Sequence, residues 1–212
     1  MRGTTRTAIG SAALVIGLVP AAGMASPRAD PRSSCFQADD APNDQAITVA
    51  VGDTYGLGES ELDITRATVR TTGSSSVVTV TMRTLKRPPM GVGHSYFIFF
   101  RYNQLDYSLA MALSSSGPAT GAGPQDHFVL GPIGGDNSLV RTLKGSIDFS
   151  RHEITVVVHP TDFQRKTFGG VVLAGAHVMS GRSVQGLGSF SDLANFASDV
   201  VLASRTNQCS VR

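Results

Sequence analysis

The sequence predicts an all-β fold, a two-sheet antiparallel β-sandwich of the jelly-roll or immunoglobulin-like kind. Three observations predict it. From Ile47 onward, short runs rich in Val, Thr, Ile and Phe are separated by clusters of Gly, Pro, Ser and Asn, the composition of strands and turns. Several runs alternate apolar with polar residues, as half-buried strands do. Only Ser191 to Leu202 carries a helical pattern, so we expect at most one short helix, near the C-terminus.

Residues 1–25 have the three regions of a cleavable secretory signal. Arg2 and Arg6 precede an uncharged apolar run from Ala8 to Val19, and a small-residue stretch ends at Ala25. As a helix, the apolar run spans about 18 Å, well short of the roughly 30 Å hydrocarbon core of a bilayer. We therefore expect a secreted, extracellular protein with no permanent membrane insertion.

Removal of the signal leaves a chain without net charge. The 18 basic residues lose Arg2 and Arg6 and become 16, equal to the 16 acidic residues. A neutral chain with no cluster of Lys and Arg lacks the field that attracts a polyanion. We expect no nucleic-acid partner.

The chain contains two cysteines, Cys35 and Cys209, one near each end of the mature protein. An exported protein meets oxidising conditions, so we expect them to form a disulfide. Closing a loop of about 175 residues restricts the unfolded chain by roughly 5 kcal/mol in the entropy model. Two separate free thiols are the alternative.

The strands follow from the patterns in chain order. Ser76 to Thr84 alternates apolar with polar residues, whereas Tyr96 to Tyr102 is apolar on both faces and is expected to be buried on both. Asn103-Gln104 joins that strand to the alternating run Tyr107 to Leu113, which predicts a hairpin. His159 to Phe163 interrupts the sheet because Pro160 cannot donate to a ladder. Further strands are expected at His127 to Leu130, Leu139 to Leu143, Ser146 to Phe149, Glu153 to Val158 and Val171 to Met179.

These elements belong to one domain, residues 47–212, which follows an extended N-terminal leader, residues 26–46, held by Cys35. The segment Ser191 to Leu202 is either the one helix, with Leu193, Phe196 and Val200 on a single face, or a closing strand. We expect a monomer.

The order of pieces resembles secreted bacterial β-sandwich modules of the DOMON-like and family 9 carbohydrate-binding-like group. The resemblance covers residues 50–195 approximately and lies in seven short stretches: Gly52-Asp53, Asp63-Ile64, Val77 to Met82, Tyr96 to Phe100, Glu153 to Phe163, Gly169-Gly170-Val171 and Asp192-Leu193-Ala194.

The resemblance implies a structural calcium held by Asp53, Asp63 and Asp192, since calcium requires several oxygen ligands. The alternative is that each aspartate bonds its own backbone at a turn or cap. We expect that the protein requires no cofactor.

The chain departs from the group in its aromatic residues. Family 9 modules hold a sugar between tryptophans, and this chain has none. Tyr55, Tyr96, Tyr102 and Tyr107 are the candidates to replace them, although packing explains the last three better because they lie within strands. Haem-binding DOMON relatives use an axial Met and an axial His. No spacing in this chain selects such a pair from the available candidates, which are Met82, Met90, Met111, Met179, His94, His127 and His177.

Catalytic motifs are missing from the sequence. No Gly-x-Ser-x-Gly elbow is present, and the zinc-protease opening His152-Glu153 has Val156 where the second histidine should stand. We assign no catalytic residue and expect a non-catalytic module that recognises a carbohydrate or another cell-envelope or extracellular ligand, or serves a structural role. A secreted hydrolase with a site assembled only in three dimensions is the alternative.

Overall fold

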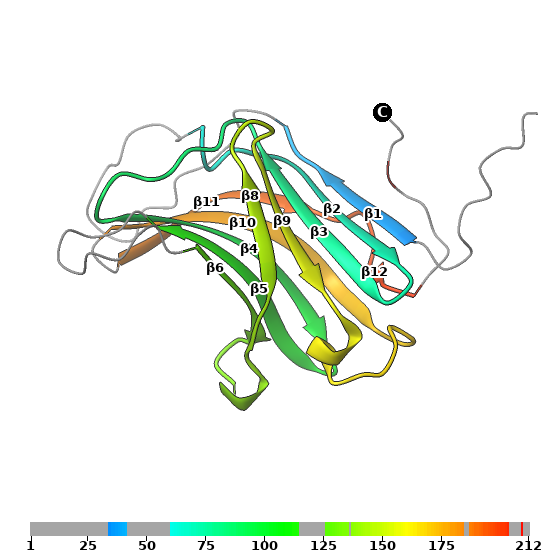
Figure 1. The fold of residues 1–212 in the computed structure, drawn as a ribbon. Coiled ribbons are helices and arrows are strands. Elements are labelled where there is room, and N and C mark those ends of the chain that lie inside the picture. Colours follow the sequence, from blue (N-terminus) through cyan, green and yellow to red (C-terminus); the bar gives the residue numbers. More distant parts are fainter. Residues whose placement is uncertain are drawn as a thin grey trace, which may run out of the picture.

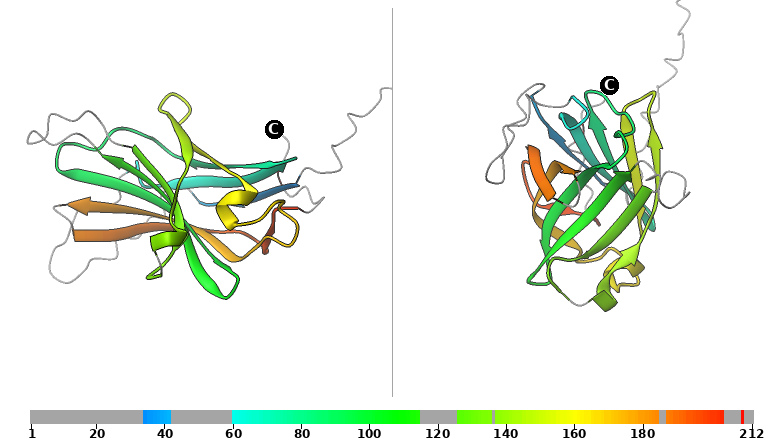
Figure 2. Two further views of the ribbon diagram at one scale, coloured as in Figure 1. Left: turned by 60° about the horizontal axis from the view of Figure 1, so that its bottom comes forward. Right: turned by 90° about the vertical axis from the view of Figure 1, so that its left-hand side faces the viewer.

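The computed structural model describes residues 34–41, 60–114, 126–135, 137–184, 187–203 and 209. They form two antiparallel sheets that pack face to face, with two short 3-10 turns and no α-helix among the described residues (Figure 1). Figure 2 shows the layers from two further sides, with β1 to β3 in one layer and β4, β5, β10 and β11 in the other. The predicted all-β sandwich is confirmed. The expected signal, residues 1–25, lies outside the described residues.

One sheet has five strands in the order β1-β2-β3-β9-β8. Their bounds are β1 Ser34–Asp39, β2 Ile64–Thr72, β3 Ser75–Met82, β9 Glu153–Val158 and β8 Lys144–Asp148. The other sheet has the order β11-β10-β4-β5-β6-β7, and β12 pairs with β10 beyond that path. Its strands are β11 Leu187–Asn195, β10 Val172–Val184, β4 Val92–Tyr102, β5 Leu105–Ser114, β6 Asp126–Pro132, β7 Arg141–Thr142 and β12 Val200–Val201.

Residues of alternate parity point into the core, as the period of two requires. In β3, Val78, Val80 and Met82 are buried while Thr79 and Thr81 face outward, which confirms the alternation expected there. The inward residues of both sheets form a single cluster, and its largest fully buried members include Tyr96, Ile98 and Met111 from the seven-stranded sheet.

The connections match the turn chemistry of the sequence. Asn103 and Gln104 join β4 to β5 with φ of 50° and 66°, the left-handed pair that a two-residue hairpin turn needs, so the predicted hairpin is confirmed. The 3-10 turn Pro160–Phe163 follows β9, as the proline predicted. Between β7 and β8 the chain passes from the seven-stranded to the five-stranded sheet at Leu143, which is buried.

The structure corrects one expectation about the chain ends and decides between two alternatives. The predicted leader contains β1, an edge strand that pairs with β2 over six residues and buries Phe36 and Ala38, so the sandwich begins before Ile47. For Ser191 to Leu202, the alternative of a closing strand is confirmed and the helix is absent. Its residues continue β11 to Asn195 and then form β12, which pairs with β10. Pairing with a strand distant in sequence outweighs the helical spacing.

Candidate functional site

The interior of the sandwich is filled by side chains in the described residues. Between the sheets lies a cavity of about 20 Å³, lined by apolar side chains and Ser76. The Ser76 hydroxyl accepts a hydrogen bond from the Thr71 hydroxyl at 3.1 Å. A space of this size holds about one water molecule and no organic ligand. An organic ligand therefore does not fit between the sheets at this position.

Asp192, one of the three predicted calcium ligands, bonds the backbone of the residue that follows a second one, Asp63. Asp192 Oδ2 accepts the Ile64 N–H at 2.6 Å, and Oδ1 accepts the Leu193 N–H at 2.9 Å. Asp63 is buried, with Oδ2 3.9 Å from Nη1 of Arg83. The described residues contain no group of three His, Cys, Asp or Glu side chains suited to a metal, and Asp53 lies outside them. The calcium site therefore stays a prediction, while Asp192 has a structural role in any case.

Two further side chains of the seven-stranded sheet bond the segment that enters β2. The Tyr96 hydroxyl donates to the Glu61 carbonyl at 2.6 Å, and the Ser180 hydroxyl donates to the Leu62 carbonyl at 2.5 Å. With Asp192, they form what we call the inter-sheet clamp: Tyr96, Ser180 and Asp192, from β4, β10 and β11. The clamp holds residues 61–64 against the opposite sheet.

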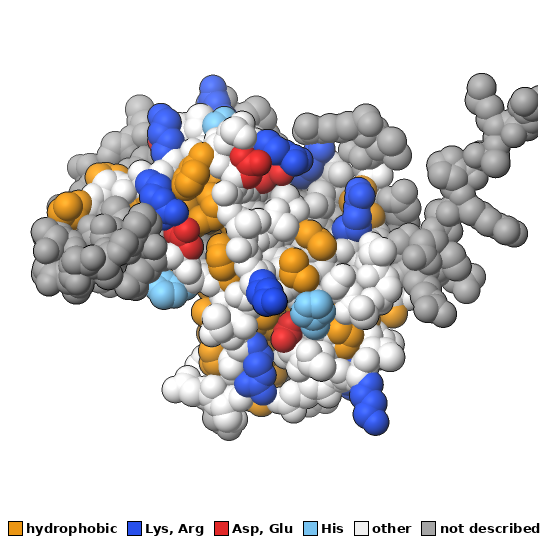
Figure 3. All heavy atoms as spheres, viewed as in Figure 1, with side chains coloured by type: hydrophobic (Ala, Val, Ile, Leu, Met, Phe, Trp, Pro, Cys, Tyr) orange, Lys and Arg blue, Asp and Glu red, His pale blue; other side chains and the backbone are white. Residues whose placement is uncertain are grey.

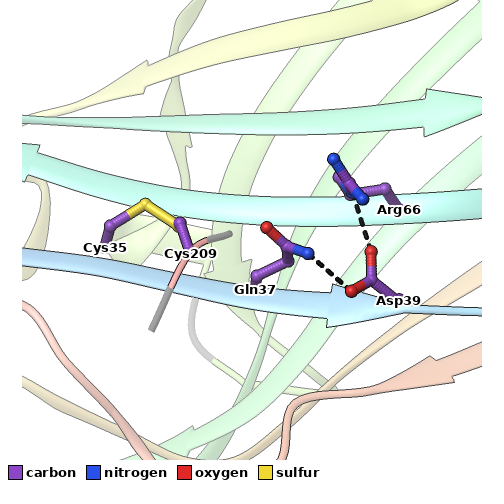
Figure 4. The surroundings of a disulfide bond; sticks show 5 residues. All are labelled: Cys35, Gln37, Asp39, Arg66 and Cys209. Atoms are coloured by element: carbon purple, nitrogen blue, oxygen red, sulfur yellow. Dashed lines mark hydrogen bonds and ion pairs between the residues drawn. A yellow bond between two sulfur atoms is a disulfide. The ribbon is translucent and has the colours of Figure 1, made fainter. Parts of the chain in front are cut away.

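The predicted disulfide is confirmed. Cys35 and Cys209 are bonded, with their Cα atoms 5.5 Å apart across a sequence separation of 174. Figure 4 shows the bond on β1; further along the same strand, Asp39 accepts from Gln37 and pairs with Arg66 at 2.7 Å. The C-terminal segment is thus fastened to the edge strand of the five-stranded sheet.

Two of the candidate methionines and two other histidines named from the sequence have structural contacts. Met82 and Met111 are buried in the core, where packing accounts for them. His152 accepts the Leu85 N–H through Nδ1 at 3.2 Å, and His159 has Nδ1 3.4 Å from the Ser74 carbonyl. These two histidines flank β9 at opposite ends, about 20 Å apart, too far to share a metal.

The outer face of the five-stranded sheet is polar. A row of outward amide and hydroxyl side chains crosses all five strands: Gln37, Thr68, Thr79, Thr155 and Ser146. This face is turned toward the viewer in Figure 3, where much of its centre is white, the colour of uncharged polar side chains and backbone. The face carries no aromatic side chain among the described outward residues of its strands.

The outer face of the seven-stranded sheet differs, because it carries aromatic and apolar side chains. We call Phe97, Phe99, His177 and Met179 the aromatic strip. Phe97 is opposite Met179 and Phe99 is opposite His177 in the register of β4 and β10. The two phenylalanine rings are nearly parallel, with centroids 5.4 Å apart, and the Phe99 and His177 centroids are 5.5 Å apart.

Small side chains lie beside the aromatic strip. Across β5, Ala110 is opposite Phe97 and Ser108 is opposite Phe99. These neighbours in β5 are short, and Phe97 and Phe99 are each only partly buried. The expectation that Tyr96 to Tyr102 is buried on both faces is therefore wrong. In a two-layer sandwich each strand has one outward face.

Three of the four tyrosines named from the sequence do not lie on an exposed surface. Tyr96, Tyr102 and Tyr107 are buried, as their position within strands predicted, and Tyr55 lies outside the described residues. The sequence did contain the information that Phe97 and Phe99 point outward. Successive side chains of a strand point to opposite faces, so Phe97 and Phe99 face away from the side that Tyr96 faces.

The fold and its surfaces define an all-β, disulfide-closed sandwich protein. No helix within the described residues is long and apolar enough to cross a membrane. Comparison with protein-family models, curated proteins and solved structures finds no match.

Proposed function

We propose that this chain is an exported, non-catalytic recognition module that binds a glycan of the cell envelope or the extracellular medium through the aromatic strip. The signal-like residues 1–25 and the disulfide support export, because disulfides persist in oxidising compartments. The outward phenylalanine pair is the single observation that carries the proposal.

An aromatic ring suits a sugar because pyranose rings present an apolar face of C–H groups to the negative face of the π-system. The aromatic strip offers two neighbouring rings, so it can receive more than one sugar unit. His177, opposite Asn195 in β11, and Ser108 next to Phe99 supply donors and acceptors for the sugar hydroxyls. Apolar platforms with a few polar groups are typical of binding surfaces.

The same face supports binding rather than catalysis. Its two described histidines, His177 on β10 and His127 on β6, are three strand spacings apart across the sheet and four residue positions apart along it, about 20 Å in all. A pair of groups that exchange protons with one substrate atom must approach within hydrogen-bond reach of it. The recognition chemistry of the strip requires no such pair.

The experiment is a binding screen of the purified, oxidised protein against insoluble polysaccharides and cell-wall polymers, followed by affinity measurement with any ligand retained. We expect Phe97→Ala with Phe99→Ala to weaken binding about tenfold or more, which corresponds to about 1.4 kcal/mol or more. The matched control is Thr79→Ala with Thr155→Ala, on the outer face of the other sheet. Equal affinity of both double variants would remove the aromatic strip from the proposal.

A structural calcium, which the family resemblance implies through Asp53, Asp63 and Asp192, has a separate test. Calcium added to chelator-treated protein should raise the melting temperature, because a ligand that binds only the folded state stabilises it. An unchanged melting curve would eliminate the metal and leave hydrogen bonding as the role of Asp192.

A further inference from the structure

The strand β8 is an open edge of the five-stranded sheet. It pairs with β9 on one side, and the strand order of the sheet ends with it on the other (Figure 1). Four of its five residues are exposed, and only Ile147 is partly buried. One of the exposed residues is Gly145, which has no side chain, so the surface that it exposes is backbone. The backbone of β8 is therefore accessible to another strand.

The opposite edge of the same sheet, β1, is covered. Phe36 is buried, and Cys35 carries the disulfide to Cys209. The Ser34 hydroxyl donates to the Leu202 carbonyl at 3.1 Å. Residues near the C-terminus thus contact β1, and β8 is the edge of this sheet that can accept a strand.

The sequence of β8 is complementary to itself. It begins with a cation, Lys144, and ends with an anion, Asp148. If two copies pair antiparallel about their middle residue, Lys144 of each lies opposite Asp148 of the other, and Ser146 lies opposite Ser146. These three side chains share the outer face, because Ile147 packs against the core and Gly145 has the same parity as Ile147. Opposite charges that face each other directly stabilise a strand pair, whereas like charges destabilise it.

The backbone of β8 restricts the register of such a pair. In an antiparallel ladder, successive residues direct their N–H and C=O groups to opposite sides of the strand. The residues that can bond a second copy therefore have one parity, and the two copies can shift only in steps of two. A shift of one step places either Lys144 or Asp148 opposite Ser146. Only the centred register joins both charged residues to a partner.

Both charged groups are available for this pairing. Lys144 has no ion-pair partner within the part of the chain that the structure describes. Asp148 accepts the N–H groups of Ser150 and Arg151 through Oδ1, which leaves Oδ2 for a second copy. Glu153, opposite Asp148 in β9, is paired with Arg151 at 3.0 Å. Its charge is therefore already compensated.

We propose that two copies of this chain pair through β8 and form a dimer with one continuous sheet across it. Lys144 and Asp148 form two ion pairs, related by a two-fold axis that passes between the two Ser146 residues. The assembly ends at two copies, because both outer edges of the joined sheet are then β1. A strand pair of five residues makes a weak and reversible interface. This dimer replaces the monomer that the sequence led us to expect.

The dimer places both aromatic strips on the same side. The two-fold axis of an antiparallel strand pair is perpendicular to the sheet, so both copies turn their seven-stranded sheets in one direction. A polymer long enough to reach both strips gains affinity without any new contact. This consequence, unlike the dimer itself, rests on the proposed function.

A cysteine on the two-fold axis tests the register. Ser146→Cys places two thiols at directly opposite positions, where Cα atoms lie about 4.5–5.5 Å apart, a separation that a disulfide spans. The two native cysteines are already bonded to each other. Under copper-catalysed air oxidation, we expect covalent dimers from Ser146→Cys, with the new bond located by peptide mapping. We expect none from Thr79→Cys, on the same outer face but two strands from β8.

Charge reversal tests the ion pairs. In sedimentation velocity at roughly 10 μM to 1 mM protein, we expect a monomer–dimer equilibrium. Lys144→Glu should weaken it about tenfold or more, because like charges then face each other twice. Asp148→Lys should do the same, and a mixture of the two variants should regain the dimer, because every facing pair is then of opposite charge. Arg70→Glu, the same reversal three strands away on β2, should have no effect.

Three results would overturn the proposal. They are a monomer at every concentration, equal effects of Lys144→Glu and Arg70→Glu, and covalent dimers that form as readily from Thr79→Cys as from Ser146→Cys. If Asp148→Lys does not fold, the Lys144→Glu and Ser146→Cys proteins still decide. Phe97→Ala should leave the equilibrium unchanged, so failure of the glycan proposal and failure of the dimer are distinguishable.

Discussion

Replacement of Tyr96 by Phe tests the inter-sheet clamp with the smallest possible change. Tyr96 is fully buried, and its hydroxyl donates to the Glu61 carbonyl at 2.6 Å. Phe keeps the ring and its packing but leaves that carbonyl without its partner. A lost hydrogen bond with a part-buried acceptor left behind costs about 1–2 kcal/mol. In a domain of this size, that lowers the melting temperature by about 3–6 °C.

The assay is reversible urea unfolding of the oxidised protein, fitted with one m-value, the slope of the free energy of unfolding against urea concentration, for all variants. Tyr107→Phe is the matched control, because Tyr107 is similarly buried and its hydroxyl makes no hydrogen bond within the described part of the chain. We expect the control to cost less than about 0.5 kcal/mol.

A double variant tests whether the clamp acts as a unit. Ser180 bonds the Leu62 carbonyl, next to the one that Tyr96 bonds, so loss of the first contact should loosen the segment that the second holds. Tyr96→Phe with Ser180→Ala should therefore cost less than the sum of the single changes, by about 0.5 kcal/mol or more. If Tyr96→Phe lowers the free energy of unfolding no more than Tyr107→Phe does, the Tyr96 hydroxyl has no energetic role. If the effects of Tyr96→Phe and Ser180→Ala simply add, the clamp does not act as a unit.

Three further predictions concern stability. Replacing Cys35 and Cys209 together by Ser should lower the free energy of unfolding by about 2–5 kcal/mol in denaturant titrations, and a loss below 1 kcal/mol would contradict the loop-closure argument. Gly145→Ala should cost about 1–3 kcal/mol, because its Cβ would lie 2.6 Å from the Phe128 ring, and an unchanged melting temperature would show that the ring moves aside freely. The hydrogen bond from the Ser150 hydroxyl, and to a smaller extent that from the Arg151 N–H, lower the pKa of Asp148 below 3.8 in the folded protein. The ionised carboxylate therefore stabilises the fold above that pH, and this stabilisation is lost as the pH falls through the lower folded-state pKa. Asp148→Asn should make the free energy of unfolding less dependent on pH in this acid range, and an unchanged dependence would exclude Asp148 as its source.

Local patterns in the sequence predicted those strands and turns that a few consecutive residues are enough to define. Glu153 to Val158 was predicted with the bounds that β9 has, and the Asn103-Gln104 turn identified its hairpin. The stretch Ser191 to Leu202 gave two answers because its apolar residues satisfy a helical and a strand spacing. The pairing of Val200 with Leu173 decides between them, and a sequence does not display that partner.

The candidate site was predictable only in part, for the same reason. The disulfide could be inferred because the chain has just two cysteines. The clamp joins residues separated by 35, 118 and 128 positions, so no local spacing reveals it. Phe97 and Phe99 were assigned to the core because hydrophobicity does not distinguish an inward from an outward side chain when both parities are apolar.

The bond between Cys35 and Cys209 also determines how the protein responds to a mechanical load. A pull applied at the two chain ends travels through the sulfur atoms, so the 173 residues between the cysteines are shielded from tension. In the oxidised form, the sheets neither unzip nor lengthen under such a pull. Reduction transfers the force to the edge strand β1, which would then peel from β2 one residue pair at a time.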